Sequence, residues 1–569
     1  MNTSLTNFLH PQGFKATTAC LLIASAVASV LADQAPTPGI QDPKVFPVLD
    51  IAERAPTPPM GFSFWNAFAS QGACDLFVRQ TAEALVAKGL KDCGYDMLLA
   101  FDGSWYSTDV NPARDAEGRM LTDAKRWPNG IKAVCDFLHA KGFKVGGYTD
   151  IGPIGYCNPK QRGFQPQDAK QYAEWGWDYI KIDDCGRTGW LNVIQPLVTE
   201  MKRPIIISLS TCTTFPFEFA PRIANMWRVG GDILLHANDQ PSPNSASNFG
   251  YVLAQFDAAE PYGWAQAPGR WNDLDMMVVG CRGISDEEAK SHFSLWAIRG
   301  APLLLGTDFR DPALDPAGIY PKINETQLGI LKNKEVIAVD QDRLGAACRK
   351  VPSTGGDAYA KPLQAFTSGK VAVLLLNRSA AASDIQVPWS SLGLKPGKAK
   401  VRDLWTHSDL GEPLDSWTAK AVPPHGVVVL IVQGAYDWDR PRSYEAESSY
   451  NSFAGLAHAT TKMKNFSSAA GVSGLGTDRS STLRFNRIAA QSNGLHALTF
   501  HYKAAAECTA TLTINNGEPI QCKLPPAPEL STDTIKATLR AGEANMVKIA
   551  CDAPSIELDQ LVVKLGDLP

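Results

Sequence analysis

Two adjacent carboxylates end an otherwise apolar stretch, DYIKIDDC, at residues 178–185. Side chains two residues apart in a strand share a face, so Lys181 and Asp183 face one way and Asp184 faces the other. If the first pair faces the inside of a barrel, Asp183 lies at its mouth beside a cation, which keeps a carboxylate ionised as a nucleophile requires. The alternative is that these aspartates cap the following helix, which suits Asp184 better than Asp183.

A second carboxylate follows another apolar stretch, in WRVGGD at residues 227–232. Arg228 suits charge balance and contact with ligand hydroxyls, and the two glycines let the backbone bend before Asp232. One ionised carboxyl and one that can carry a proton, about 5–5.5 Å apart, are what a retaining glycosidase needs. A further acidic pair, Asp273 and Asp275, suggests a metal site, but with no histidine nearby we interpret it as support for the same group of residues.

Eight stretches with strand character alternate with amphipathic helical stretches over roughly 250 residues, the count and length of a (β/α)8 barrel. A doubly wound open sheet is the alternative fold, but it would need a Gly-rich phosphate loop after the first strand, and the sequence has none there. The expected strands are 60–66, 96–103, 144–150, 178–184, 204–210, 225–231, 271–279 and 301–308.

Polar or aromatic side chains stand at the ends of these strands, where barrel enzymes carry their active sites. A single aspartate there is weak evidence, because a solvated loop end often carries one. Because polar or aromatic residues recur at most of the eight strand ends, we expect them to form one functional site at that rim of the barrel. The residues are Trp65, Asp102, Asp150, Lys181 with Asp183 and Asp184, Ser208 with Ser210, Arg228 with Asp232, Asp273 with Asp275, and Asp308.

Composition changes along the chain predict an α/β TIM barrel followed by two antiparallel β-sandwich domains. Beyond about residue 350 short alternating runs replace the helical patterns, as expected for all-β domains. The predicted parts are a signal peptide (1–32), a Pro-rich arm (33–56), the barrel (57–348), a first sandwich (349–435), and a second sandwich (443–569).

The bulk properties narrow the possible partners. With 569 residues and a net charge of −4, the chain offers no electrostatic reason to bind nucleic acid or an anionic membrane. The apolar run at 17–32 is typical of a secretory signal, so we expect a secreted protein, extracellular or periplasmic, in which disulfides are permitted. No CxxC pair is present, which argues against structural zinc.

Six motifs, in order from about residue 57 to 345, resemble glycoside hydrolase family 27, the α-galactosidase and α-N-acetylgalactosaminidase type. The resemblance implies Asp183 as nucleophile and Asp232 as acid/base, with no metal or other cofactor in the bond cleavage. The motifs are TPPMGFSFWNAF, YIKIDDC, WRVGGD, WNDLDMMVVG, HFSLWAIRGAPLLLGTDFR and NKEVIAVDQDRLG. The resemblance also implies sugar contacts from Trp65, Asp102, Lys181 and Arg228, and a disulfide between Cys157 and Cys185.

The chain departs from the family pattern at two places. The usual IDDCW on the second strand is FDGSW, so a carboxylate is replaced by Gly103 and a half-cystine by Ser104, leaving Cys74 without its expected partner. Where α-galactosidases usually place a glutamate that reads the 2-hydroxyl, this sequence has Ser210. A small residue there could admit a bulkier 2-substituent, or the loop has been rebuilt.

The last domain resembles carbohydrate-binding modules of families 6 and 35, through YEAE at 444–447 and LDQLVV at 558–563. In those families two glutamates and a late aspartate commonly hold structural calcium, which prefers hard oxygen ligands. The candidates here are Glu445, Glu447 and Asp559, and an empty sandwich with solvated carboxylates is the alternative.

The expected function is therefore a secreted retaining exo-glycosidase that hydrolyses terminal α-D-galactosides of an oligosaccharide or polysaccharide. One alternative keeps the mechanism and changes the sugar to an α-N-acetylgalactosaminide, a β-L-arabinopyranoside or an α-glucan. Another is a carbohydrate-binding protein that has lost catalysis, against which the retention of both carboxylates argues. The oligomeric state is left open.

Overall fold

The computed structural model describes residues 51–68, 74–101, 114–151, 164–183, 190–210, 219–233, 249–320, 322–552 and 556–565. The predicted signal peptide, most of the Pro-rich arm, Asp102, Gly103, Ser104, Cys157, Asp184 and Cys185 lie outside these residues.

Eight parallel strands form the first sheet, in the ring order β7-β6-β5-β4-β3-β2-β1-β8. A parallel bridge between Met277 and Leu305 joins the segment after β7 to β8 and closes the ring. The predicted TIM barrel is therefore confirmed. The strands are β1 (Met60–Ser63), β2 (Met97–Phe101), β3 (Lys144–Asp150), β4 (Tyr179–Asp183), β5 (Ile206–Ser210), β6 (Met226–Arg228), β7 (Trp271–Asp273) and β8 (Leu303–Leu305).

Two apolar cores lie on the two sides of this sheet, because alternate residues of each strand point to opposite faces. The smaller core fills the inside of the barrel and contains Ala55, Met97, Leu99, Tyr179, Ile206, Met226, Trp271, Met276 and Leu304. The larger core lies between the strands and the helices and includes Leu98, Val145, Ile180, Ile182, Ile207, Leu209 and Trp227.

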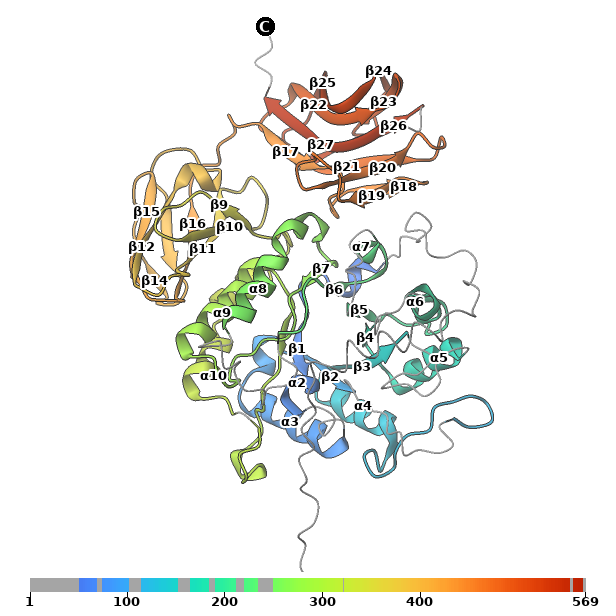
Figure 1. The fold of residues 1–569 in the computed structure, drawn as a ribbon, viewed down its shortest axis with the longest axis vertical. Coiled ribbons are helices and arrows are strands. Elements are labelled where there is room, and N and C mark those ends of the chain that lie inside the picture. The colour runs from blue at the N-terminus through green and yellow to red at the C-terminus, as the bar shows by residue number, and fades with distance from the viewer. Residues whose placement is uncertain are drawn as a thin grey trace, which may run out of the picture. The chain divides into compact units, whose positions relative to one another are not determined.

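Helices surround the strands on the outside, as Figure 1 shows for α3, α4, α5, α6, α8 and α9. No helix in the described residues is long and apolar enough to cross a membrane. The helices are α2 (Phe64–Phe68), α3 (Asp75–Ala87), α4 (Gly130–Ala140), α5 (Gln165–Trp175), α6 (Trp190–Thr199), α7 (Ala220–Ile223), α8 (Phe249–Ala258), α9 (Asp286–Arg299), α10 (Glu325–Leu331) and α11 (Lys334–Asp340). Short 3-10 turns are η3 (Ala52–Arg54), η5 (Lys91–Cys93), η6 (Glu260–Ala265) and η7 (Pro312–Leu314).

The first strand is shorter than the sequence predicts. It ends at Ser63, and α2 begins at Phe64. Helical spacing brings Phe64 and Phe68 to one side, with ring centroids 5.8 Å apart, and buries both in the outer core. Trp65 therefore lies on a helix at the end of β1, and its ring packs against the core inside the barrel.

Residues before β1 cover the N-terminal ends of β5, β6 and β7. Trp271 donates a hydrogen bond to the Ala55 carbonyl (2.8 Å), and Asn225 donates to the Ile51 carbonyl (2.8 Å). Arg54 donates to the carbonyl of Ile205 (3.0 Å). This end of the barrel is thus occupied by chain, so a ligand has to approach from the C-terminal ends of the strands.

The first sandwich pairs a six-stranded antiparallel sheet, ordered β14-β13-β16-β11-β10-β9, with the two strands β12 and β15. Alternating apolar side chains such as Val371, Val373 and Leu375 of β11 fill the core between them. The elements are β9 (Arg349–Val351), β10 (Asp357–Pro362), β11 (Lys370–Leu376), β12 (Ser383–Pro388), η8 (Trp389–Leu392), β13 (Lys400–Asp403), β14 (Ser408–Asp409), β15 (Ser416–Val422) and β16 (Val427–Gln433).

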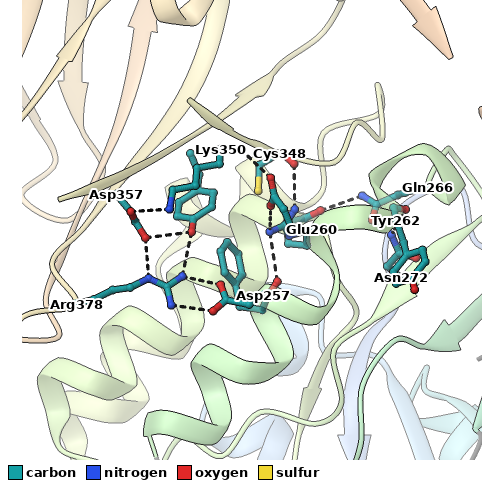
Figure 2. Close-up of polar contacts among 12 residues, drawn as sticks. Asp257, Glu260, Tyr262, Gln266, Asn272, Cys348, Lys350, Asp357 and Arg378 are labelled. Atoms are coloured by element: carbon teal, nitrogen blue, oxygen red, sulfur yellow. Dashed lines mark hydrogen bonds and ion pairs between the residues drawn. The ribbon is translucent and has the colours of Figure 1, made fainter. Parts of the chain in front are cut away.

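A charged network joins helix α8 of the barrel to this sandwich (Figure 2). Arg378 binds both carboxylate oxygens of Asp257, at 2.9 and 2.6 Å, and a third bond of 2.7 Å goes to Asp357. Lys350 makes a second ion pair with Asp357, at 2.8 Å, and its backbone N–H donates to Glu260 at 3.0 Å. Bidentate arginine–carboxylate pairs fix orientation as well as distance, so these contacts set the position of β10 on α8.

The second sandwich has two facing antiparallel sheets, ordered β19-β20-β27-β22-β25, with β17 paired to β27, and β18-β21-β26-β23-β24. Its own core includes Leu498, Phe500, Leu512, Val547 and Leu561. The strands are β17 (Arg442–Glu445), β18 (Ser452–Ala454), β19 (His458–Thr461), β20 (Ala470–Leu475), β21 (Thr482–Ala490), β22 (Gly494–Ala504), β23 (Cys508–Ile514), β24 (Ile520–Leu524), β25 (Ala527–Leu539), β26 (Gly542–Cys551) and β27 (Ile556–Leu565).

Asn225 provides a test of how the N-terminal end of the barrel is held. The side chain is fully buried, donates to the carbonyls of Ile51 and Gly269, and accepts from the N–H of Ile207 at 3.1 Å. Asn225→Ala would leave these buried backbone groups unpaired, so we expect the free energy of unfolding to fall by about 2–3 kcal/mol in urea denaturation. Asn192→Ala, at an exposed position of α6, is the matched control and should change it by less than about 0.5 kcal/mol. Equal stability of the two variants would contradict this assignment.

Candidate active site

Strand β4 directs Lys181 and Asp183 toward the inside of the barrel. Tyr179, two residues before Lys181, belongs to the interior core, whereas Ile180 and Ile182 belong to the outer core. The strand period of two then places Lys181 and Asp183 on the same inner face as Tyr179. The orientation predicted from the sequence is the one the fold has. Both side chains are half-buried, so they remain accessible at the mouth.

The register of the parallel strands places three polar residues at one level of the rim. Asp150 at the end of β3 pairs with Asp183, and Asp183 pairs with Ser210 at the end of β5. Neighbouring strands lie about 4.8 Å apart, so these side chains form a continuous row. Asp150 and Ser210 are only 1% and 5% exposed, which leaves Asp183 as the most accessible member of the row.

Tyr148 of β3 connects Lys181 and Asp183. Its hydroxyl donates a hydrogen bond of 3.1 Å to Asp183 Oδ2, and the ammonium of Lys181 lies 5.7 Å from the centre of its ring. The in-register pairing of Tyr148 with Lys181 explains this arrangement. A hydroxyl donor and a nearby cation both stabilise negative charge on the Asp183 carboxylate. Sequence reasoning missed Tyr148, although it shares the inward parity of Asp150.

Arg228 forms the second half of the rim, on β6. Its guanidinium lies 3.0 Å from Asp275 Oδ2 and 3.1 Å from Asp232 Oδ1, and it donates to the carbonyls of Gly230 and Gly231. Burial by itself would lower the pKa of Arg228, but Asp275, Asp273 and Asp232 together raise it. The arginine therefore stays charged and orients Asp232, whose side chain is 61% exposed at the mouth.

The two glycines before Asp232 have different roles. A Cβ atom on Gly230 would lie 1.9 Å from Gln255 Oε1, so a larger residue here would require the end of this side chain of α8 to move. Gly231 has open space around it, and its carbonyl accepts a hydrogen bond of 2.6 Å from Gln255 Nε2. Close packing, in addition to the flexibility expected from the sequence, therefore explains Gly230.

Asp275 supports Arg228 from a left-handed backbone conformation, with φ of 77°. Its carboxylate also accepts a hydrogen bond of 2.8 Å from the N–H of Ile233, next to Asp232. Asp273 accepts from the N–H of Asp275 at 2.9 Å, which completes the turn. Burial raises the pKa values of both aspartates, and Arg228 opposes that increase. This agrees with the supporting role expected for the pair from the sequence.

A separate acidic cluster lies in the second sandwich. The Ser467 hydroxyl lies 2.6 Å from Glu445 Oε2 and 2.8 Å from Asp559 Oδ1, and Ser468 donates to Glu447. Glu447 Oε2 and Asp559 Oδ2 are buried and have no hydrogen-bond partner. Burial, with Glu445 nearby, raises the pKa of Glu447 to about 8. As the side chains stand, no group of three or more His, Cys, Asp or Glu residues in the described part of the chain is arranged as a metal site.

The predicted site residues thus fall into three sets. Trp65, Lys181, Asp183, Ser210, Arg228 and Asp232 all lie at the C-terminal ends of barrel strands or just beyond them. Glu445, Glu447 and Asp559 form the cluster in the second sandwich. Asp102 and the predicted pair Cys157 and Cys185 lie outside the described residues, while Cys74 has a free thiol.

Comparison with known proteins identifies the family. The family model described as alpha galactosidase A matches residues 57–342, and that of the alpha galactosidase C-terminal beta sandwich domain matches residues 353–432. The chain belongs to the α-galactosidase family of glycoside hydrolases. It is 38% identical over 366 residues to an α-galactosidase of Cyamopsis tetragonoloba, covering 62% of this chain and 80% of that one.

Solved structures extend the comparison. α-Galactosidase I of Mortierella vinacea is 28% identical, with a TM-score of 0.58 over 67% of this chain and 98% of its own. An isomalto-dextranase of Arthrobacter globiformis, complexed with panose, is 17% identical with a TM-score of 0.57, and it covers 93% of this chain and 99% of its own. At that identity the second match shows the fold alone, and its extent indicates that the succession of a barrel and β domains recurs in another chain.

Tyr148→Phe tests the hydrogen bond to Asp183. Loss of a hydrogen bond to a charged group costs about 1.5–3 kcal/mol, so we expect kcat/KM on a nitrophenyl α-galactoside to fall about 10- to 100-fold while the thermal midpoint is kept. Tyr502→Phe is the matched control, since it removes a bond of 3.2 Å to the Pro525 carbonyl far along the chain in the second sandwich. A Tyr148→Phe enzyme as active as this control would show that the bond does not support turnover.

Asp275 can be tested with two substitutions that separate charge from conformation. Asn adopts the left-handed region readily, so Asp275→Asn should fold normally but lose the ion pair to Arg228. We expect kcat to fall by about 100-fold, as for loss of one preorganised electrostatic contact. Asp275→Ala should lose a similar amount of activity and also stability, because Ala is strained at a φ of 77°. Wild-type kcat in the Asn variant would exclude a role for the charge.

Proposed function

We propose that this chain is a retaining exo-α-galactosidase in which Asp183 is the nucleophile and Asp232 the acid/base. The observation that carries the proposal is the inward row of Lys181 and Asp183 on β4, level with the end of β6, where Arg228 holds Asp232 at the same rim. One strand, β5, lies between β4 and β6, so their backbones are two strand spacings, about 10 Å, apart. Side chains that converge toward the barrel axis can approach the roughly 5–5.5 Å of a retaining pair.

In the first step, Asp183 attacks the anomeric carbon while Asp232 protonates the departing glycosidic oxygen. The bond to the leaving group breaks, and a covalent galactosyl ester forms on Asp183. In the second step, Asp232 takes a proton from water, which attacks the same carbon and releases galactose with its original configuration. Tyr148 and Lys181 stabilise the Asp183 carboxylate before attack and as it leaves.

The two carboxylates have environments that suit these different roles. Asp183 is half-buried and accepts a hydrogen bond from Tyr148, which suits an ionised nucleophile. Asp232 is largely exposed and is bound by Arg228 through one oxygen, Oδ1, at 3.1 Å. The exposure of this side chain leaves the carboxyl accessible to a leaving group and to water.

Ser210 favours a second candidate substrate. It lies level with Asp183 on the neighbouring strand, at the position where the family resemblance places a glutamate that reads the 2-hydroxyl. A hydroxymethyl side chain leaves more room than a glutamate, which supports activity on an α-N-acetylgalactosaminide by the same mechanism. A panel of nitrophenyl glycosides, including a β-L-arabinopyranoside and an α-glucoside, ranks these sugars by kcat/KM.

The remaining proposals concern the rest of the chain. We propose that the apolar run at 17–32 directs secretion and that the second sandwich is a carbohydrate-binding module. We also propose that Glu445, Glu447 and Asp559 hold a structural calcium ion. Their carboxylates suit a hard cation, and the two buried oxygens without partners are what such an ion would satisfy. The ion would stabilise the sandwich, and the hydrolytic steps involve only barrel residues.

Asp183→Asn should abolish turnover of a nitrophenyl α-galactoside without changing the fold, because the amide is no nucleophile. Proton NMR of the wild-type reaction should show α-galactose as the first product. Asp232→Asn should be rescued by azide, which needs no general base and attacks the galactosyl ester on Asp183 to give α-galactosyl azide, with the configuration of the substrate retained. A β-galactose first product, or an active Asp183→Asn enzyme, would refute the assignment, and far-UV circular dichroism serves as the folding control.

Calcium should change how stability depends on pH. Without calcium, burial raises the pKa of Glu447 to about 8, so the folded state holds a proton that the unfolded state releases near its ordinary value. Stability is then greatest at low pH and falls as pH rises toward 8. Added calcium should raise the thermal midpoint at pH 8 more than at pH 5, and Glu447→Gln should abolish both effects. An unchanged midpoint at pH 8 with millimolar calcium would refute the ion site.

A further inference from the structure

A hollow of about 570 Å³ lies between the first sandwich and the segment 434–443 that leads out of it. Four cationic side chains line it, together with the rings of Phe366 and Tyr436. We name it the arginine hollow, after Arg349, Arg440 and Arg442, which lie there with Lys370. It belongs to a different part of the chain from the barrel rim, because the residues around it come from 346–371, 391–393 and 436–445.

None of these four cations forms an ion pair with a described residue. Arg440 donates to the Ser390 carbonyl at 2.5 Å, and Arg442 donates to the Phe366 carbonyl and the Tyr436 hydroxyl. Arg349 and Lys370 have no side-chain partner within the described part of the chain. Burial, followed by repulsion from Arg440 and Arg442, lowers the pKa of Arg349. Concentrated positive charge of this kind is a cost unless an anion offsets it.

The carboxylates at the hollow are engaged elsewhere. Asp437 and Glu445 are the acidic side chains that line it. Asp437 accepts from the N–H of Asp439 at 3.2 Å, and Glu445 accepts from the hydroxyl of Ser467 at 2.6 Å. Four cations against two carboxylates leave local positive charge on a chain whose net charge is −4. The excess is therefore a property of this site and not of the whole surface.

The hollow is also preorganised. Two backbone hydrogen bonds hold the segment after β16 against the sandwich. The N–H of Lys395 donates to the Ala435 carbonyl (2.8 Å), and the N–H of Asp437 donates to the Gly393 carbonyl (3.0 Å). The guanidinium of Arg442 lies 5.2 Å from the ring centre of Phe366 and 5.5 Å from that of Tyr436. Stacking of this kind fixes the plane of the guanidinium, so little ordering remains for a ligand to impose.

We propose that the arginine hollow binds a sugar that carries a carboxylate, a uronic acid unit of an acidic polysaccharide. Guanidinium groups match a planar carboxylate in geometry, and aromatic rings offer an apolar face to a sugar ring. The volume lies in the range of small-molecule sites, about 300–1,000 Å³, and suits a short oligosaccharide. Such a site would hold the enzyme on an acidic glycan while the barrel removes neutral sugars from it.

Calorimetric titration of the full chain with trigalacturonic acid tests the proposal. We expect saturable binding, and Arg349→Gln and Lys370→Gln each to weaken it at least tenfold, with thermal midpoints unchanged since neither side chain has a protein partner. Arg479→Gln removes one positive charge at an exposed position outside the hollow and should bind as the wild type does. Affinity should fall with added salt, as charge pairing requires.

Two further ligands distinguish the contribution of the negative charge to binding from that of the sugar ring. A neutral galactotriose should not bind the hollow, and inorganic phosphate should compete only at far higher concentration than trigalacturonic acid. Phosphate as strong a competitor as the sugar acid would overturn the sugar part of the proposal. Absence of heat with trigalacturonic acid, or equal affinities of Arg349→Gln, Lys370→Gln and wild type, would overturn it entirely. Hydrolysis of nitrophenyl α-galactoside should be unchanged in these variants, so the barrel assignment is tested separately.

Discussion

The buried charge of Arg228 is the constraint on which the rim depends. A guanidinium that is 3% exposed cannot remain inside a barrel without compensation, and Asp275 and Asp232 supply it together with two backbone carbonyls. This requirement connects β6, the glycine segment behind it and the turn after β7 into one unit. Asp232 reaches the mouth because the cation beneath it has a second, fully buried partner.

The other half of the rim is built on a different principle. Parallel pairing places Lys181 and Asp183 on the same face as Tyr148 of the neighbouring strand β3. The Tyr148 hydroxyl donates a hydrogen bond to Asp183, and its ring lies near the Lys181 ammonium. The half on β3 and β4 is therefore positioned by strand pairing, and the half on β6 and β7 by charge neutralisation. In the proposed mechanism the first half holds the nucleophile in place, and the second half holds the residue that exchanges protons with the leaving group and water.

The first sandwich is anchored to the barrel by an ion pair. The bidentate pair between Arg378 and Asp257 fixes the first sandwich to α8, the same helix whose Gln255 packs against Gly230 near the rim (Figure 2). The edge of that sandwich then carries the arginine hollow, and the second sandwich carries a buried acidic cluster. Two regions of opposite charge thus lie in succession along the β part of a chain that is close to neutral overall.

Sequence by itself determined the eight-strand alternation, the inward parity of Lys181 and Asp183, and the pairing of Arg228 with a carboxylate, because strand period and close sequence spacing are local properties. Only the tertiary structure decided that Tyr148 donates a hydrogen bond to Asp183 and that Asp275 forms an ion pair with Arg228. These partners are 35 and 47 residues apart in the sequence. It also decided that Gly230 packs closely against Gln255 and that Trp65 lies on a helix. Such contacts depend on the register between strands and on side-chain packing. Neither can be inferred from the spacing of residue types along a single sequence.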